Sequence, residues 1–375
     1  MFFSKIDNPI GLDLSDLSVK LVQLNRKGPG LELSAYADVS LPGGLLEHDL
    51  IQNREALVDY LKRVFSNKDS HKGKFAGRSI VASIPESKAF VRVINLPSLM
   101  PEELVTAVPI EAEQYIPLPI GEMQVDWQVV ARSDAGLQVF ITATPKSYIE
   151  ELLSVFSDAG LVVQSIEAES AAIVRALLKK SDNPPGTLIL DMNASRTSFI
   201  LYVANSIQFT SSIPMAGNAL TDAIAQRLKL NKTEAEKIKR HYGISSYSLP
   251  GEKVSPETAT TISEVVIALE PVLNNLYDEM KNTIKFYEEH NLSGTSGAVI
   301  QEIIICGGTS KLPNLSEYLQ GKIQADNEFS RRGIKVSLGD AWRNIIENGP
   351  PPFSQREALS YTTALGLALR NYEIS

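Results

Sequence analysis

Sulfur and imidazole side chains are scarce in this sequence. It contains one cysteine, Cys306, and four histidines among its 375 residues. One cysteine cannot form a disulfide within the chain, and such usage is typical of proteins from a reducing compartment. So few cysteines and histidines also disfavour a structural zinc site. We therefore expect a cytoplasmic protein without disulfides or zinc.

Long hydrophobic runs are absent as well. A membrane-spanning helix needs about 18 or more consecutive apolar residues, and no such run occurs. Residues 1–9 lack the basic region and the apolar core of about 7–15 residues that mark a signal peptide. We therefore expect the chain to reach a membrane only through partners.

The sequence also lacks an excess of basic residues. Lys and Arg number 36 against 44 Asp and Glu, so the formal net charge is −8. Because so acidic a chain is not expected to form a broad phosphate-neutralising surface, we predict no nucleic-acid partner. The Walker and dinucleotide-binding glycine motifs are missing too, and no hydrolase triad stands out. We therefore assign no catalytic residue.

The residues that are present indicate a globular protein with an internal duplication. Hydrophobic residues make up 43% and charged residues 21%, and the length predicts two or three domains. A pattern of three short strands occurs twice, and in both copies the first strand ends at an aspartate, Asp13 or Asp191. The six predicted strands are Ile10–Leu14, Val19–Asn25, Leu31–Ser40, Thr187–Asp191, Ser198–Ala204 and Ser206–Ile213.

Further elements follow from apolar periodicity and from the positions of Gly and Pro. The predicted helices are 53–65, 101–115, 146–159, 168–180, 218–228, 232–241, 259–289 and 359–370. The further strands are 79–84, 90–96, 124–131, 137–144, 161–166 and 302–306. A linker is expected at 181–186, and polar loops at 245–256 and around the prolines at 350–352. This alternation predicts an α/β fold.

The first duplicated strand pair has the composition of a phosphate site. Asp13 ends one strand, a polar turn with Ser15 and Ser18 follows, and Lys20 lies on the returning strand. Asp13 suits Mg²⁺ held through water, and the turn N–H groups and Lys20 suit phosphate oxygens. The alternative is a plain hairpin with a solvated lysine.

The second copy repeats this logic. Asp191 follows a buried strand, and a polar turn with Asn193 leads to Thr197. Asp191 alone could simply start a turn, which is a common role of aspartate. Because the two aspartates occupy matching positions of the duplication, we favour the phosphate site for both.

Two further motifs lie in the second half of the chain. Gly307 and Gly308 follow a buried strand and would let the backbone approach a flat ligand, with Thr309 or Ser310 capping the next helix. Cys306 is interpreted as a packed strand residue. Glu236 and Lys239 are three apart and share a helix face, although a solvated charged helix has the same pattern.

These motifs, in this order, resemble the actin-like ATPase superfamily, which includes actin, the sugar kinases and the division protein FtsA. Residues 11–20 and 187–197 look like its two phosphate motifs, and 302–315 looks like its adenosine motif. Residues 167–171 and 361–366 look like its two connecting helices. The resemblance implies two duplicated ribonuclease-H-like lobes with ATP and Mg²⁺ in the cleft between them.

The resemblance also assigns roles to single residues. Glu236 and Lys239 match the pair that faces the ribose and base of adenosine. Asp13 and Asp191 would hold Mg²⁺ through water. The other residues expected to contact the nucleotide are Ser15, Ser18, Lys20, Asn193, Thr197, Gly217, Gly307, Gly308 and Thr309.

Within the superfamily, the closer resemblance is to the PilM family, the cytoplasmic scaffold of type IV pilus assembly. Its marks are Leu96-Pro97 and the runs 101–104 and 111–117, which lie where FtsA and PilM insert a small α+β subdomain. FtsA proteins carry a C-terminal amphipathic membrane helix, and this sequence ends soon after the second connecting helix. We therefore expect a PilM-type protein.

The PilM resemblance predicts four parts and a set of partners. The parts are a first lobe core (1–84, 167–182, 357–375), the inserted subdomain (85–166), a second lobe core (183–228, 300–356) and a helical subdomain (229–299). The implied partner is the N-terminal cytoplasmic tail of the inner-membrane protein PilN, bound in extended form beside the inserted subdomain, with contacts from Tyr115 and Ile116. Other pilus platform and motor proteins and self-association are further expectations.

Two positions depart from the family pattern. Leu14 and Asn193 stand where these proteins usually have glycine, and a side chain there would crowd the phosphates. We therefore expect ATP binding with weak or no hydrolysis. The alternatives are an FtsA-like filament protein of cell division and a small-molecule kinase of the same superfamily.

Overall fold

The computed structural model describes residues 8–28, 30–66, 71–134, 136–245, 256–289, 299–345 and 351–372, without the side chains of 256–259. The chain forms two compact units. Unit 1 comprises Met1–Asp182, Asn205–Thr210 and Asp340–Ser375, and unit 2 comprises Asn183–Ala204 and Ser211–Gly339. Most of the loop expected at 245–256, and the first of the prolines at 350–352, lie outside the described residues.

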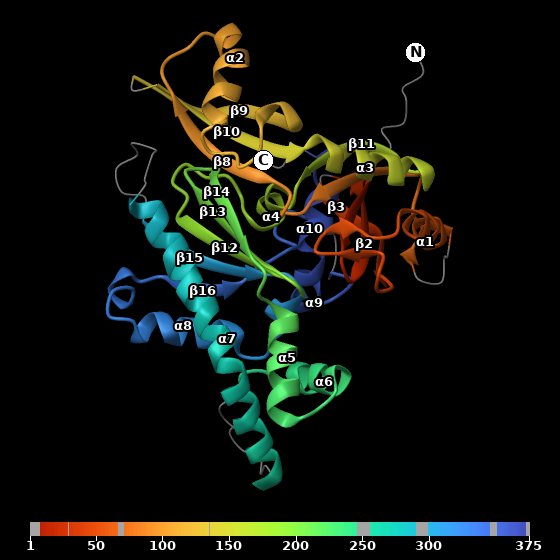
Figure 1. Ribbon diagram of the computed structural model, residues 1–375, viewed down its shortest axis with the longest axis vertical. Coiled ribbons are helices and arrows are strands. Elements are labelled where there is room, and N and C mark those ends of the chain that lie inside the picture. Colours follow the sequence, from red (N-terminus) through yellow and green to blue (C-terminus); the bar gives the residue numbers. More distant parts are fainter. Residues whose placement is uncertain are drawn as a thin grey trace. The chain divides into compact units, whose positions relative to one another are not determined.

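A six-stranded sheet forms the centre of unit 1 (Figure 1). Its strands, in spatial order, are β11 (Val162–Ala168), β7 (Ser79–Ile84), β1 (Ile10–Ser15), β2 (Ser18–Lys27), β3 (Gly30–Ser40) and β6 (Lys72–Gly73). β1 pairs antiparallel with β2 and parallel with β7. The short hairpin of β4 (Leu46–Glu47) and β5 (Leu50–Ile51) and the helix α1 (Arg54–Ser66) follow β3.

Two helices pack closely on this sheet and on each other. They are α4 (Glu169–Leu177) and α10 (Thr362–Ala368). Gly11 of β1 makes room for α10, because an added Cβ there would lie 2.2 Å from the carbonyl oxygen of Ala364. Gly366 makes room for α4 in the same way, with the Ala172 carbonyl oxygen 1.9 Å from an added Cβ. These are the two helices expected to connect the lobes.

The expected helix 359–370 is shorter and interrupted. The chain forms α9 (Gln355–Ala358), a 3₁₀ turn (Leu359–Tyr361) and then α10. Glu167, at the end of β11, holds the neighbouring elements together. It accepts two hydrogen bonds from Arg175 of α4, at 2.5 and 2.8 Å, and pairs with Arg370.

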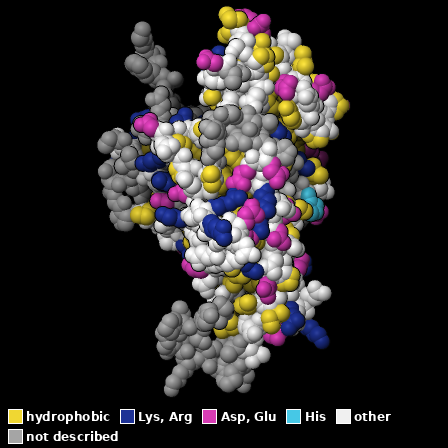
Figure 2. Space-filling model, turned by 90° about the vertical axis from the view of Figure 1, so that its left-hand side faces the viewer, with side chains coloured by type: hydrophobic (Ala, Val, Ile, Leu, Met, Phe, Trp, Pro, Cys, Tyr) yellow, Lys and Arg dark blue, Asp and Glu magenta, His cyan; other side chains and the backbone are white. Residues whose placement is uncertain are grey.

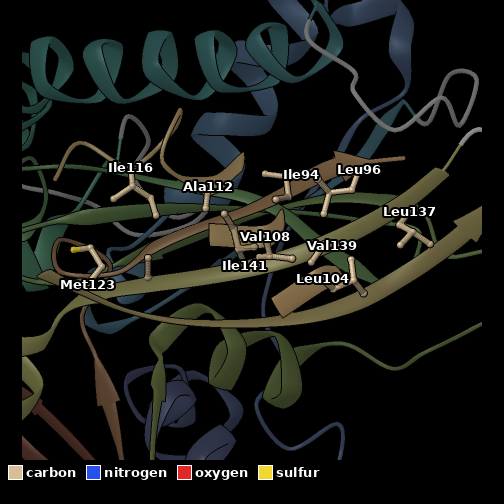
Figure 3. Packing of buried hydrophobic residues seen from close by; sticks show 11 residues of the cluster. Ile94, Leu96, Leu104, Val108, Ala112, Ile116, Met123, Leu137, Val139 and Ile141 are labelled. Atoms are coloured by element: carbon tan, nitrogen blue, oxygen red, sulfur yellow. The ribbon is translucent and has the colours of Figure 1, made fainter. Parts of the chain in front are cut away.

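The segment inserted after β7 contributes three further paired strands to unit 1. Its strands are β8 (Phe90–Leu96), β10 (Gly136–Pro145) and β9 (Met123–Ser133), and Phe209 of β14 (Ser206–Ile213) pairs with Arg92 of β8. A cluster of buried apolar side chains lies between these strands and α2 (Pro101–Ala112) (Figure 3). The 3₁₀ turn Ile120–Glu122 leads into β9.

Two expectations for this segment are corrected. α2 ends at Ala112 rather than Tyr115, because Gln114 and Tyr115 donate to carbonyls three residues back and Ile116 precedes a proline, which disfavours helix there. The strand expected at 161–166 was assigned to the inserted subdomain. It is β11, which follows α3 (Lys146–Asp158) and pairs with β7 in the six-stranded sheet.

One further boundary differs from the expectation. Residues 340–356, expected in the second lobe core, group with unit 1.

Unit 2 repeats the strand arrangement of unit 1. Its strands follow the order β16 (Lys335–Leu338), β15 (Ile300–Cys306), β12 (Gly186–Met192) and β13 (Thr197–Val203). β12 pairs antiparallel with β13 and parallel with β15, as β1 does with β2 and β7. The predicted duplication is therefore visible in the pairing.

The helices of unit 2 match most of the predicted spans. They are α5 (Gly217–Leu228), α6 (Lys232–Tyr242), α7 (Pro256–Glu289) and α8 (Leu315–Ala325), with 3₁₀ turns at Gly308–Lys311 and Ser330–Arg332. α7 continues as one helix through Pro271. Among the helices that the structure describes, none has the length and apolar character needed to cross a bilayer.

Candidate functional site

The residues of the first phosphate motif lie together in unit 1. Asp13 of β1 and Lys20 of β2 are cross-strand partners, and the Lys20 Nζ lies 3.8 Å from the Asp13 Oδ2. The same Nζ donates to the Ser18 hydroxyl at 2.7 Å, and the Ser15 and Ser18 hydroxyl oxygens are 3.3 Å apart. The hairpin thus groups a carboxylate, an ammonium and two hydroxyls.

Burial dominates the electrostatics of Asp13. The side chain is 7% exposed, and this burial raises its pKa, while Lys20 lowers it and two further carboxylates, Asp38 and Asp49, raise it again. A cation near Asp13 would favour its charged form, because the carboxylate is otherwise disfavoured there.

Asp49 was missed by the sequence reasoning. It is buried and has φ of 61°, in the two-residue turn between β4 and β5. The Ser87 hydroxyl donates to its Oδ2 at 2.6 Å, and its own N–H donates to Asp16. The sequence did not predict this turn, because His48-Asp49 stands where a two-residue hairpin turn usually has Asn-Gly. The burial of Asp49 could not be predicted from the sequence either.

Leu14 does not crowd this motif. It lies within β1, where successive side chains point to opposite faces, so its side chain leaves the strand on the face opposite Asp13. It is 9% exposed and packs in the core. Leu14 and Asn193 are not among the described residues that have a left-handed φ. The backbone therefore does not require glycine at either position.

The second phosphate motif lies in unit 2 and is already hydrogen-bonded. Asp191 is 2% exposed at the end of β12. Its Oδ2 accepts from the Asn193 side-chain amide at 2.7 Å, and its Oδ1 accepts from the Cys306 thiol at 3.5 Å. Burial and the neighbouring carboxylate raise the pKa of Cys306, so the thiol stays protonated and packed, as its place in the strand predicted.

The backbone of Asn193 joins three segments. Its carbonyl oxygen accepts from the Gly217 N–H at 3.1 Å and from the Thr309 hydroxyl at 2.6 Å. Thr197, expected to contact nucleotide, is fully buried instead, and its hydroxyl donates to the Met215 carbonyl at 2.7 Å. Because Thr197 starts β13 with its side chain turned inward, it supports the backbone before α5.

The two glycines after β15 differ in their surroundings: Gly307 is required by the backbone, whereas Gly308 lies in open space. Gly307 has φ of 83°, and an added Cβ would lie 2.5 Å from the Met192 carbonyl oxygen and 2.6 Å from the Asp191 Oδ1. At Gly308 an added Cβ meets nothing within 4 Å. Helix capping by this motif was wrongly predicted, because residues 308–311 form a 3₁₀ turn and α8 begins only after Asn314.

Glu236 and Lys239 do not lie on a solvated face of α6. Lys239 is 7% exposed, and its Nζ lies 2.6 Å from the Glu236 Oε2. It also donates to the Gly217 carbonyl and the Thr221 hydroxyl, both at 2.8 Å. Burial opposes ionisation of Glu236, but hydrogen bonds from Lys239, Thr221 and Arg240 outweigh it and lower the pKa to about 2. Burial also lowers the pKa of Lys239.

Three sequence motifs therefore meet at Gly217, the first residue of α5. An added Cβ at Gly217 would lie 2.5 Å from the Thr309 Oγ1, 3.4 Å from the Asn193 carbonyl oxygen and 3.5 Å from the Lys239 Nζ. These residues come from the second phosphate turn, the segment after it, α6 and the glycine motif. The arrangement offers backbone and side-chain polar groups of the kind that bind phosphate and ribose.

Asp13 and Asp191 are the residues expected to hold a metal ion. In the described part of the chain, no group of three or more His, Cys, Asp or Glu side chains is placed to bind one. Both Asp191 oxygens already accept hydrogen bonds, and Asp13 is balanced by Lys20. These residues fit Mg²⁺ only as outer ligands through water, since Mg²⁺ keeps several waters and binds phosphates.

The two expected partner contacts differ in exposure. Ile116 is 6% exposed and belongs to the core cluster of Figure 3, so the expectation that it is a surface contact is corrected. Tyr115 is half-buried, with its hydroxyl 3.2 Å from the Glu111 Oε1 and the Arg92 guanidinium 4.5 Å from its ring centre. Burial, and then Glu111, raise the pKa of Tyr115.

Residues 11–372 match the family model described as type IV pilus assembly protein PilM. The chain belongs to the PilM family. Among solved structures, it is similar to a PilM–PilN type IV pilus biogenesis complex, with a TM-score of 0.76 and 24% identity over 99% of this chain and 100% of that one. MreB5 of Spiroplasma citri bound to AMPPNP has a TM-score of 0.54 and 16% identity, covering 96% and 95%. These likenesses show an actin-like ATPase fold.

The curated relatives of this PilM-family chain include division proteins. It is 26% identical to FtsA of Borreliella burgdorferi over 246 residues, 63% of this chain and 55% of the relative. It is 27% identical to FtsA of Pseudomonas aeruginosa over 217 residues, 56% of this chain and 48% of the relative. The chain thus spans about half the length of the curated relatives it matches.

Proposed function

We propose that this PilM-family chain is a nucleotide-binding scaffold of the type IV pilus assembly platform. The supporting observation is the convergence of Asn193, Gly217, Lys239 and Thr309 at the start of α5. MreB5, a neighbour in fold, is described as bound to AMPPNP. ATP would place its phosphates near the second phosphate turn and its adenosine near α6 and Gly308.

Mg²⁺ is proposed to arrive with the phosphates of ATP. Its chemistry would be to neutralise phosphate charge. Asp13 and Asp191 would contact its waters, and Lys20, Ser15 and Ser18 would bind phosphate oxygens. We propose weak or no hydrolysis, because both oxygens of Asp191 already accept hydrogen bonds and are therefore poor bases toward an attacking water.

Fluorescent ATP binding tests this role. We would titrate the wild type and the isosteric variants Asp13→Asn and Asp191→Asn with a fluorescent ATP analogue and Mg²⁺. Asp222→Asn serves as the control, because Asp222 is an exposed acid on α5 paired with Lys232. We expect each test variant to weaken binding about tenfold and the control to leave it unchanged. Equal binding by all four proteins would refute the site.

The partner is proposed to be the N-terminal cytoplasmic tail of PilN. A similar fold is described in a PilM–PilN complex, and Tyr115 offers a half-buried aromatic surface beside the inserted strands. The tail would bind in extended form and bring the chain to the inner membrane. Other platform and motor proteins, and further copies of this chain, are additional proposed partners.

Calorimetry with a synthetic PilN tail tests the partner. Tyr115→Ala removes the aromatic surface, and Tyr242→Ala on α6 is a matched loss of a half-buried tyrosine. We expect the first variant to weaken binding at least fivefold and the second to bind like the wild type. Tail binding without any ATP affinity would leave a protein scaffold that makes no use of nucleotide.

A further inference from the structure

The helix α2 buries one stripe and leaves apolar residues on its outer side. The buried stripe, with residues four apart, consists of Leu104, Val108 and Ala112. On the outer side, Val105 is 66% and Ile110 is 63% exposed. Residues three and four apart adjoin on a helix surface. The outer apolar patch, called the α2 face, therefore consists of Val105, Thr106, Pro109 and Ile110.

Acidic residues border the α2 face at both ends. Glu102 precedes it and Glu113 follows it, and both are exposed. They are eleven residues apart, which is about 16 Å along a helix. The whole segment 93–131 contains six acidic residues and no Lys, Arg or His, and Arg92 and Arg132 flank it directly. Figure 2 shows hydrophobic and acidic side chains side by side at the upper end of the molecule, which carries α2 in Figure 1.

This charge pattern selects among possible occupants. Two α2 faces from two copies would bring their glutamates together, and like charges at an interface are unfavourable. Anionic lipid headgroups and nucleic acid phosphates would be repelled for the same reason. A positively charged partner with apolar side chains satisfies both features of the surface, because its charges would meet glutamates that have no basic neighbour within the segment.

We propose that the α2 face docks a cationic amphipathic segment of a partner protein. Lys or Arg side chains of the partner lie opposite Glu102 and Glu113, and its apolar side chains cover Val105 and Ile110. The α2 face contains neither Tyr115 nor any residue proposed to contact nucleotide. The face is small, so binding is modest in affinity, and its exposed charges make it weaken with salt.

Fluorescence anisotropy with a defined probe tests this proposal on the full chain. The probe is an 18-residue labelled helix with Leu on one side and Lys on the other. Val105→Ser with Ile110→Ser removes the apolar part, and Glu102→Lys with Glu113→Lys reverses the charges. Both pairs are on the surface, so circular dichroism and the melting temperature should match the wild type.

Matched controls separate docking from general attraction to an acidic protein. Ile267→Ser removes an exposed apolar residue of α7, and Glu55→Lys with Glu150→Lys makes the same charge change on α1 and α3. We expect at least fivefold weaker binding for the apolar pair, at least tenfold for the charge pair, and less than twofold change for the controls.

Several outcomes would overturn the proposal. Equal losses in the control variants would mean non-specific attraction, and unchanged binding in the α2 variants would mean that the face is not used. Sedimentation of the wild type that shows self-association lost in the Val105→Ser, Ile110→Ser variant would assign the face to a second copy. Co-sedimentation with phosphatidylglycerol vesicles lost in that variant would assign it to lipid.

Discussion

At the residue scale, Asn193 stands out because its side chain donates a hydrogen bond to the buried carboxylate of Asp191. Its amide donates to Asp191 while its carbonyl oxygen holds Gly217 and Thr309. One residue thus orders the turn and occupies an Asp191 oxygen. The effect of the departure from glycine is therefore a hydrogen bond rather than steric crowding.

Replacing Asn193→Gly should free Asp191 and loosen the turn. The variant loses a hydrogen bond to a carboxylate, so we expect about 1.5–3 kcal/mol lower stability in urea unfolding. We also expect its ATP affinity to depend on Mg²⁺ several-fold more than that of the wild type, as measured with and without EDTA. Asn205→Gly is the control for a lost side-chain hydrogen bond away from Asp191, because Asn205 bonds the backbone of Ser181 and its φ of 61° suits glycine. Unchanged Mg²⁺ dependence would contradict this role.

Substitution by alanine should lower the stability of the protein at Gly307 but not at the adjacent Gly308. Gly307→Ala meets the Met192 carbonyl at 2.5 Å in a left-handed conformation, so we expect a loss of more than about 2 kcal/mol in urea unfolding. Gly308→Ala has open space and should stay within about 0.5 kcal/mol. If nucleotide passes over Gly308, the second variant loses ATP affinity without losing stability. A stable Gly307→Ala variant would contradict the geometry.

At the element scale, close helix contacts in unit 1 depend on missing side chains. Gly366→Ala would put a methyl group 1.9 Å from the Ala172 carbonyl oxygen, which forces α4 and α10 apart. We expect a loss of about 3 kcal/mol or more in urea unfolding. Gly321→Ala in α8 is the matched control, because its added Cβ meets nothing within 4 Å. Alanine favours helix, so this control should gain up to about 1 kcal/mol.

Glu236 of α6 accepts a hydrogen bond from Thr221 of α5, and this contact should affect the stability of the protein at acidic pH. The pKa of Glu236 is lowered from its usual 4.5 to about 2, so the folded state binds this proton less readily than the unfolded chain. Its contribution is present above about pH 4.5 and is lost as the pH falls toward 2. Glu236→Gln should flatten that part of the stability profile. Urea unfolding of the wild type and the variant, followed from pH 6 to 2.5, measures this change.

At the scale of the whole molecule, the duplication could be predicted from the sequence because short runs of consecutive residues reveal it. Apolar runs ending at Asp13 and Asp191 sit in strands with nearly the predicted bounds. The sheet that β11 joins was not readable, because pairing with β7 is a contact between distant segments. The same holds for the burial of Thr197 and Lys239 and for the place of Asp49, which depend on packing from other elements.

Nucleotide binding should appear as protection of segments that are far apart in sequence. Hydrogen exchange with and without Mg-ATP should slow around 191–197, 217–221, 236–239 and 307–309 together, because these segments meet at the start of α5. The exchange of α2, residues 101–112, should not change. Slowing confined to one of the four segments would contradict their common role.

The buried thiol of Cys306 has a practical consequence for spectroscopy. It is the only cysteine of the sequence, its side chain is fully buried, and its raised pKa keeps it protonated. Maleimide dyes react with accessible thiolates, so the natural chain offers them little background. Cysteines introduced at exposed Glu55 and Lys232 would carry a donor–acceptor pair, one dye on each unit, in an otherwise native protein. Single-molecule energy transfer could then follow the two units through nucleotide and partner binding.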